Sequence, residues 1–160
     1  MVKTNKIKLI RTGALTVEFL GTNLRAIKFG GVEVLRGISY LVRDESWGTV
    51  PSKISGYKIV RSKAGTTINY AANAATLTMK AQIEVQPREL VFMVRTTPSA
   101  TFKTNRTGFV VLHPAGAAGK SLMVTHTDGT REKARFPKLI SPKQPFFEIR
   151  ALEHNPAPGL

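Results

Sequence analysis

Hydrophobic and polar residues alternate with a period of two along most of the chain. In the clearest run, apolar side chains occupy positions 77, 79, 81, 83 and 85, and polar side chains stand between them. This alternation is typical of a β-strand with one buried face and one face in water. Shorter versions occur in ALTVEFL (14–20), YKIVRS (57–62), TTINYA (66–71) and FFEIRAL (146–152). The pattern predicts strands from one end of the chain to the other.

The segment ELVFMV (89–94) is apolar on both faces. Such a run is expected of a strand that is covered on both sides, so we expect it to lie centrally in its sheet. Glycine, proline and Asp-Gly turn signals recur about every 8 to 12 residues, and no window keeps a helical period. We therefore expect an all-β fold, an antiparallel β-sandwich of about a dozen strands in a single domain. This domain should span 1–153, with 154–160 as a linker or truncated end.

Two long segments interrupt the strand pattern, RDESWGTVPSK (43–53) and RFPKLISPKQPFF (135–147). Long loops on a rigid β scaffold often carry binding residues. Trp47 offers a flat indole face that suits a sugar ring, although burial beneath its loop is the commoner fate of such a side chain. Asn105 and Arg106 stand directly before an apolar run, and Arg106 either clamps a carboxylate or pins the strand end in an ion pair. Trp47, Asn105 and Arg106 are the ligand-binding candidates.

Candidate acids and bases for catalysis are few. Asp44, Glu45 and Asp128 are the carboxylates expected in loops, although Asp128 also suits the first position of a turn. His113 and His126 are the candidate bases. The chain has no G-x-S-x-G elbow, so a serine nucleophile of that kind is not expected.

The histidines do not suggest a metal site. If 107–113 and 120–126 form a hairpin, His113 and His126 lie roughly 20 Å apart, and His154 falls in the tail. The chain has no cysteine, which excludes disulfides and thiolate-bound zinc. We expect neither a metal ion nor a cofactor.

The segment PAGAAGKS (114–121) resembles a phosphate-binding P-loop at its Gly-Lys-Ser end. The P-loop requires a glycine where this chain has Pro114, and proline has no N–H to offer a phosphate. The following SLMVTH alternates like a strand, so no helix N-terminus is expected there. The segment is therefore predicted to be a connecting loop, and nucleotide binding is not expected.

Charge is the unusual bulk property, with 24 Lys+Arg against 10 Asp+Glu and a formal net charge of +14. No acid occurs between Glu45 and Glu84, or between Glu89 and Asp128. This imbalance favours an anionic partner: nucleic acid, a sugar acid or an acidic protein surface. The sequence shows neither the aromatic platforms of a single-strand binder nor a groove-reading element. No stretch has the length of a membrane span or signal peptide, so we expect a soluble cytoplasmic protein.

Longer stretches resemble a known family. VRDESWGTVP, the run from NRTGFVVLHP to FEIRALEH, and the closing APGL together look like the N-terminal region of D-apionate lactonases, and IKFGGVEVLRGISYLVRD adds to the match. The resemblance implies a β-sandwich that precedes a larger barrel-type domain in an enzyme that hydrolyses D-apionolactone to D-apionate. It assigns no catalytic residue to this segment. The leading hypothesis is a β-sandwich domain of a sugar lactone hydrolase without a complete active site, whose partners are a sugar acid or lactone and a C-terminal barrel-type domain.

Two alternatives belong to other classes. The first is a stand-alone, non-catalytic carbohydrate-binding β-sandwich, which predicts saturable sugar binding that depends on Trp47. The second is a basic nucleic-acid-binding protein, which predicts an affinity that falls steeply with salt.

Overall fold

The computed structural model describes residues 6–139 and 144–157, and within them the regular secondary structure is almost entirely β-strand. The strands are β1 (Lys8–Thr12), β2 (Leu15–Leu20), β3 (Asn23–Phe29), β4 (Val32–Asp44), β5 (Lys53–Arg61), β6 (Thr66–Ala74), β7 (Leu77–Val85), β8 (Leu90–Pro98), β9 (Thr104–Leu112), β10 (Ser121–His126), β11 (Arg131–Arg135) and β12 (Ile149–Glu153), with a short 3₁₀ turn η1 at Ala115–Ala117. Every strand pairing is antiparallel. The predicted all-β antiparallel fold with about a dozen strands is confirmed.

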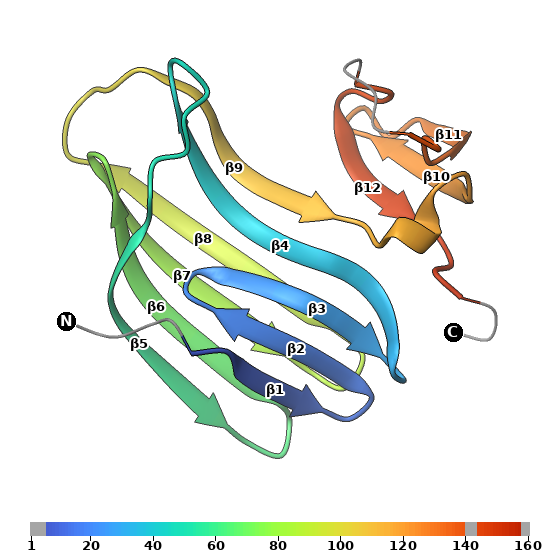
Figure 1. Ribbon diagram of the computed structural model, residues 1–160, viewed down its shortest axis with the longest axis horizontal. Helices are drawn as coiled ribbons and strands as arrows, with labels where there is room; N and C mark the ends of the chain where they lie inside the picture. The colour runs from blue at the N-terminus through green and yellow to red at the C-terminus, as the bar shows by residue number, and fades with distance from the viewer. Residues whose placement is uncertain (1–5, 140–143, 158–160) are drawn as a thin grey trace. The chain divides into compact units, whose positions relative to one another are not determined.

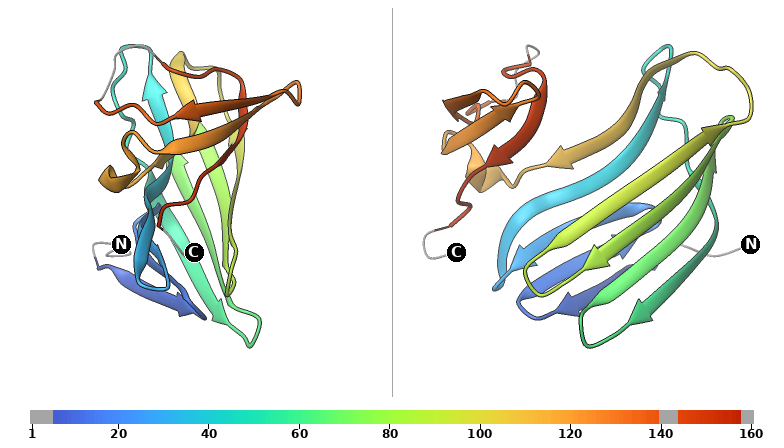
Figure 2. Two further views of the ribbon diagram at one scale, coloured as in Figure 1. Left: turned by 90° about the vertical axis from the view of Figure 1, so that its right-hand side faces the viewer. Right: turned by 180° about the vertical axis from the view of Figure 1, so that it is seen from behind.

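The chain forms two compact units, Met1–Leu112 and His113–Leu160. Unit 1 contains a five-stranded sheet in the order β1-β2-β3-β4-β9 and a four-stranded sheet in the order β5-β6-β7-β8. The two sheets form the layers visible in Figures 1 and 2. The extent of one domain over 1–153 and the linker role of 154–160 stay predictions, and 158–160 lie outside the described residues.

The core of unit 1 follows from the period-two pattern. The five-stranded sheet contributes Val17 and Leu24, and the four-stranded sheet contributes Ile68 and Ile83, all with at most 1% of their surface exposed. Fully burying an aliphatic side chain of this size contributes about 1.5–3 kcal/mol. On β7 the polar residues that alternate with the buried ones point away from the core, which is why its sequence predicts the buried face so clearly.

The turn between β3 and β4 shows how the chain reverses with so few residues. Phe29 pairs with Val32, so only Gly30 and Gly31 form the loop, and both have positive φ (56° and 85°). Two successive positive φ values are the requirement of a type I′ hairpin turn, which matches the right-handed twist of the strands. Residues other than glycine would be strained here.

Two predictions about strand neighbours are wrong. The run 89–94 does not lie centrally, because β8 is an edge strand of its sheet and Met93 is 45% exposed on the outer face. The hairpin of 107–113 with 120–126 does not form, because β9 pairs with the long strand β4 and β10 pairs with β11 and β12. Residues 114–120 do form a connecting loop, as expected, and it contains η1.

Unit 2 contains one three-stranded sheet in the order β11-β10-β12. A tight turn at Asp128-Gly129 joins β10 to β11, and β12 returns on the other side of β10. Of the irregular segment predicted at 135–147, residues 136–139 and 144–147 carry no strand, and 140–143 lie outside the described residues. No helix in the described part of the chain is long and apolar enough to cross a membrane.

Candidate functional site

The loop that follows β4 is built around the carboxylate of Asp44. Asp44 Oδ1 accepts hydrogen bonds from the backbone N–H groups of Ser46 (2.9 Å) and Gly48 (2.8 Å), and the Asp44 N–H donates to the Gly48 carbonyl (2.9 Å). A Cβ at position 48 would clash with this carboxylate, so any other residue there would push the Asp44 side chain from its hydrogen-bonded position. Asp44 therefore orders the loop.

Trp47 stands out in this loop because it is both strained and exposed. Its φ is 67°, in the left-handed region where glycine or asparagine is usual, and 56% of its surface is exposed. The alternative that Trp47 is buried under its loop is therefore wrong. A large aromatic side chain held outward in an unfavourable backbone conformation is typical of a binding position.

Two arginines contact Trp47, Arg106 at its indole and Arg43 at its backbone carbonyl. Arg43 on β4 and Arg106 on β9 are directly opposite each other across the strand pair. The Arg106 guanidinium carbon is 5.6 Å from the centre of the indole, within cation–π range. Arg43 donates to the Trp47 carbonyl (3.3 Å) and to the Thr49 hydroxyl. Opposed like charges destabilise a sheet, so this pairing favours a bound anion.

A β-bulge places Asn105 beside this pair. Arg43 pairs with Arg106 and Asp44 pairs with Thr104, so Asn105 is the extra residue on β9. Bulges redirect side chains and are frequent next to functional sites. Among the described residues no carboxylate forms an ion pair with Arg106, so the expected ion pair at the strand end is absent there. Glu45 instead pairs with Lys103 at 3.7 Å, on the surface.

A hollow of about 560 Å³ is lined by the connection that follows this loop. Thr49 and Ser52 contribute hydroxyls from the connection, Thr22 and Asn23 contribute polar groups from the β2–β3 turn, and Tyr40 contributes its ring from β4. A lining rich in hydroxyl and amide groups suits a small polar ligand. We call Arg43, Trp47, Asn105 and Arg106 the loop cluster.

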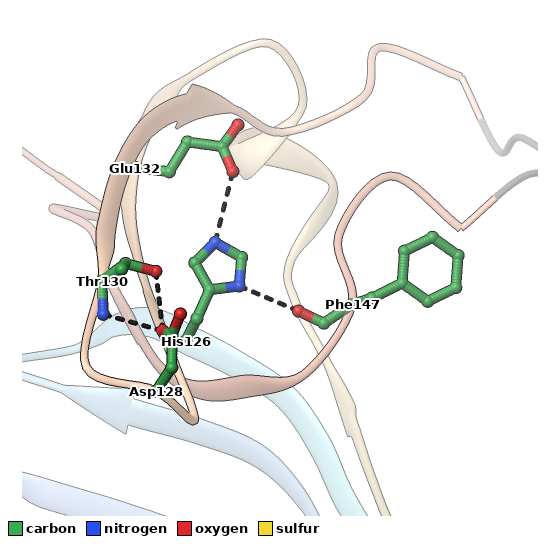
Figure 3. Close-up of polar contacts among 5 residues, drawn as sticks. All are labelled: His126, Asp128, Thr130, Glu132 and Phe147. Carbon is green, nitrogen blue, oxygen red and sulfur yellow. Dashed lines mark hydrogen bonds and ion pairs between the residues drawn. The ribbon is translucent and has the colours of Figure 1, made fainter.

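His126 lies in a second polar cluster, in unit 2 (Figure 3). Its Nδ1 is 2.9 Å from the carbonyl oxygen of Phe147, and its Nε2 is 3.3 Å from a carboxylate oxygen of Glu132. Both partners accept hydrogen bonds, so the imidazolium form, with an N–H on each nitrogen, satisfies both. The hydrogen bond to Phe147, with the one to Glu132, raises the pKa of His126. Both nitrogens of His126 are thus engaged in hydrogen bonds, and neither is placed to accept a proton from a substrate.

Asp128 has the structural role that the turn alternative gives it. Its Oδ1 accepts hydrogen bonds from the Thr130 N–H (2.9 Å) and hydroxyl (2.7 Å), as Figure 3 shows, and these bonds lower the pKa of Asp128. Gly129, with φ 88°, completes a three-residue hairpin loop. Within the described residues, Asp44, Glu45 and Asp128 are thus each engaged in a loop bond, a turn bond or a surface ion pair.

His113 and His154 meet each other, against the expectation that His154 lies apart in a tail. Their ring centres are 5.0 Å apart, and Phe136 packs against both, tilted at 4.7 Å from His113 and edge-on at 5.0 Å from His154. Burial lowers the pKa of each ring, helped by the neighbouring imidazole for His113 and by Lys120 for His154. Both rings pack here as aromatic side chains. His154 reaches this position because β12 runs along β10 and brings the following residue back to unit 2.

Four residues of these clusters were not among the candidates that the sequence offered: Arg43, Lys103, Glu132 and Phe136. Glu132 had a signal: the Asp128-Gly129 turn fixes the β10–β11 register, and this register pairs Glu132 with Val124, diagonally next to His126. Arg43 also had a signal, because it begins the irregular segment 43–53 and lies only four residues before Trp47. Lys103 had none, because it meets Glu45 through a contact between distant segments.

These features define the class first: an all-β protein that carries a strained, exposed tryptophan on a loop of a β-sandwich. The family of D-apionate lactonase N-terminal domains matches residues 2–160, and the chain belongs to this family. A D-apionate lactonase from Brucella anthropi is 39% identical over 158 aligned residues, which cover 94% of this chain and 26% of that relative. The chain thus spans about a quarter of the length of the curated relative. No solved structure matches it.

Proposed function

We propose that this chain is a non-catalytic β-domain of a sugar lactone hydrolase and that its loop cluster binds the sugar acid or lactone. The observation that carries the proposal is the exposed, strained Trp47, whose indole lies beside the guanidinium group of Arg106 and whose carbonyl accepts a hydrogen bond from Arg43. The indole offers a flat apolar surface to one face of a sugar ring. The arginines offer paired donors to a carboxylate or to a polarised lactone carbonyl.

The proposed lack of catalysis rests on how the candidate acids and bases are engaged. Hydrolysis of a lactone needs a group that takes a proton from water, and such a base needs a free nitrogen or oxygen near the reacting carbon. His126 has both nitrogens bonded, and the Asp44 carboxylate holds its own loop. Among the described residues the Nδ1 of His113 has no hydrogen-bond partner, but it is buried where the ring packs against Phe136 and His154, out of contact with a substrate. The catalytic groups would then belong to the rest of a full-length family member, which we propose to be a C-terminal barrel-type domain. The name of the Brucella anthropi relative, D-apionate lactonase, suggests D-apionolactone as the substrate.

The binding part can be tested with the chain's own fluorescence, because Trp47 is its single tryptophan. Titration with D-apionate or D-apionolactone should change the indole emission saturably. Arg106→Gln should weaken this binding several-fold, since it removes a charged donor and keeps a side chain of similar length. Arg61→Gln, at the exposed end of β5, is the matched control and should bind as the parent does. Equal affinity of all three proteins would refute the assignment of the loop cluster.

The catalytic part needs a separate measurement. Purified chain should release no protons from D-apionolactone above the spontaneous rate of ring opening. Turnover that survives repurification would refute a non-catalytic role and would require a complete site within these residues. A chain that binds and does not turn over is the expected result.

A further inference from the structure

The outer face of the three-stranded sheet in unit 2 carries an open groove that the proposed function does not use. Alternation along β10 turns Leu122 and Val124 to the buried side, and Ser121 and Met123 to the outer side. The groove has a volume of about 570 Å³ and is lined by Ser121, Leu122, Met123, Lys133, Ala134, Arg135 and Glu153. This volume is within the range of small-molecule sites, roughly 300–1,000 Å³.

The strand register aligns a row of cations along this groove. Arg135 pairs with Ser121, Lys133 with Met123 and Arg131 with Thr125, so the three basic side chains share one face of β11. Successive members of the row are two residues apart, or about 7 Å. A row of cations at this spacing creates a positive potential over the groove.

The acid on the same face does not neutralise the whole row. Glu153 lies opposite Met123 on the β12 side and binds Arg131 through both carboxylate oxygens, at 2.8 and 3.0 Å. Arg135 is held by a hydrogen bond to the Gly119 carbonyl at 3.2 Å, which leaves its positive charge in place. Within the described residues no carboxylate forms an ion pair with Lys133 or Arg135. The uncompensated charge therefore lies at the Ser121 end of the groove.

We propose that this groove binds a small polyhydroxylated carboxylate. Lys133 and Arg135 would hold the carboxylate, because charge-assisted hydrogen bonds to Lys and Arg are the strongest available to it. The Ser121 hydroxyl and the rim of Glu153 offer partners to the ligand's hydroxyls, and Met123 offers an apolar floor to its C–H groups. A longer polyanion fits less well, since Arg131 is already neutralised.

The simpler interpretation is that the cations only protect an edge. β11 lies at the edge of its sheet, and charged residues on edge strands prevent pairing with other chains. That role needs charge alone and no selectivity for a ligand. The two interpretations therefore differ in whether a carboxylate with hydroxyl groups binds better than other solutes.

The test uses NMR on the 160-residue chain with labelled methionine methyl groups and backbone amides. D-gluconate, as the probe, should shift the Met123 methyl and the amides of Ser121 and Lys133 saturably. Neutral sorbitol should not do so, and inorganic phosphate should bind more weakly than D-gluconate. Lys133→Gln should weaken D-gluconate binding by about tenfold or more. Lys58→Gln, on an exposed position of β5 in unit 1, is the matched control and should leave binding unchanged.

The outcomes separate cleanly. Unshifted groove resonances, or equal shifts in the Lys133→Gln variant, would overturn the site and leave edge protection as the role of the row. Phosphate binding as tight as D-gluconate binding would overturn the polyhydroxylated ligand in favour of a simple anion site. The groove shares no residue with the loop cluster, and Trp47 emission reports on that cluster. Failure of one proposal is therefore distinguishable from failure of the other.

Discussion

Replacing Trp47 by glycine and by alanine tests whether this position is strained for the sake of its side chain. At most positions alanine is more stable than glycine by about 0.5–1 kcal/mol, because glycine loses more backbone entropy on folding. At φ 67° the order should reverse, since the left-handed conformation costs a residue with a Cβ about 1–2 kcal/mol. Both variants lose the contact with Arg106, so that loss cancels in the comparison.

The expected net difference is about 0.5–1 kcal/mol in favour of Trp47→Gly. Urea denaturation followed by far-ultraviolet circular dichroism measures it, because the variants lack the single tryptophan. With a slope on the order of 2 kcal/mol/M, the two midpoints should differ by roughly 0.3–0.5 M. Lys63 is exposed and has no positive φ, so its glycine and alanine variants form the control and should show the usual order.

A Trp47→Ala variant as stable as Trp47→Gly, or more stable, would refute the strain argument. If the order reverses as expected, a better turn residue exists for this loop, and the tryptophan is retained at a cost to stability. That cost is what a binding role for the indole predicts.

Three further results are expected. Ile83→Ala should destabilise the chain by about 2–5 kcal/mol in the same urea assay, because its side chain has no exposed surface, whereas Val60→Ala, at a site that is 43% exposed, should cost far less. Gly65→Ala should lower the melting temperature clearly, since φ is 153° at this position and the new Cβ would clash with the Val85 carbonyl oxygen at the end of β7. Gly56→Ala is the control, because its Cβ would meet nothing within 4 Å; equal melting temperatures of the two variants would contradict the expected clash at position 65. Acid should destabilise the parent more than the His154→Phe variant. Burial lowers the pKa of His154 in the folded chain, so the unfolded chain takes up a proton at a higher pH than the folded chain does. The stability that the neutral ring contributes above about pH 6.5 is therefore lost as the pH falls toward the folded-state pKa. Melting scans at pH about 7.5 and 5.5 measure the effect, and an equal acid shift in both proteins would contradict it.

Strand faces were the part of the fold that sequence could predict. The polar side chains at positions 78 and 80 are exposed on β7 and alternate with buried neighbours, because burial of one sheet face imposes a period of two. Strand neighbours were harder. The run at 89–94 is apolar enough for a central strand, yet Met93 lies exposed on an edge strand. Hydrophobicity indicates how buried a strand is on average, but it does not indicate which strands lie beside it or in which register.

The sequence predicted individual members of the loop cluster but not their proximity, because proximity depends on strand pairing. Trp47 and Arg106 were each selected by residue type and local context, and the structure brings them within 5.6 Å of each other. Their meeting depends on the pairing of β4 with β9, which lie far apart in sequence, and no local pattern encodes such a pairing. His154 shows the reverse case: its segment has no periodicity, and only the return of β12 along β10 gives it neighbours.

The order of strands in unit 2 bears on how the chain folds as it is synthesised. The pairings of unit 1 are complete once β9 ends at Leu112, so that sandwich can close while later residues are still being added. The central strand β10 of unit 2 has its second neighbour only when β12, Ile149–Glu153, has been made. During that interval one edge of β10 lacks its partner, and its N–H and C=O groups can pair with another chain. We therefore expect folding of unit 2 to be the step most sensitive to chain concentration and to chaperones.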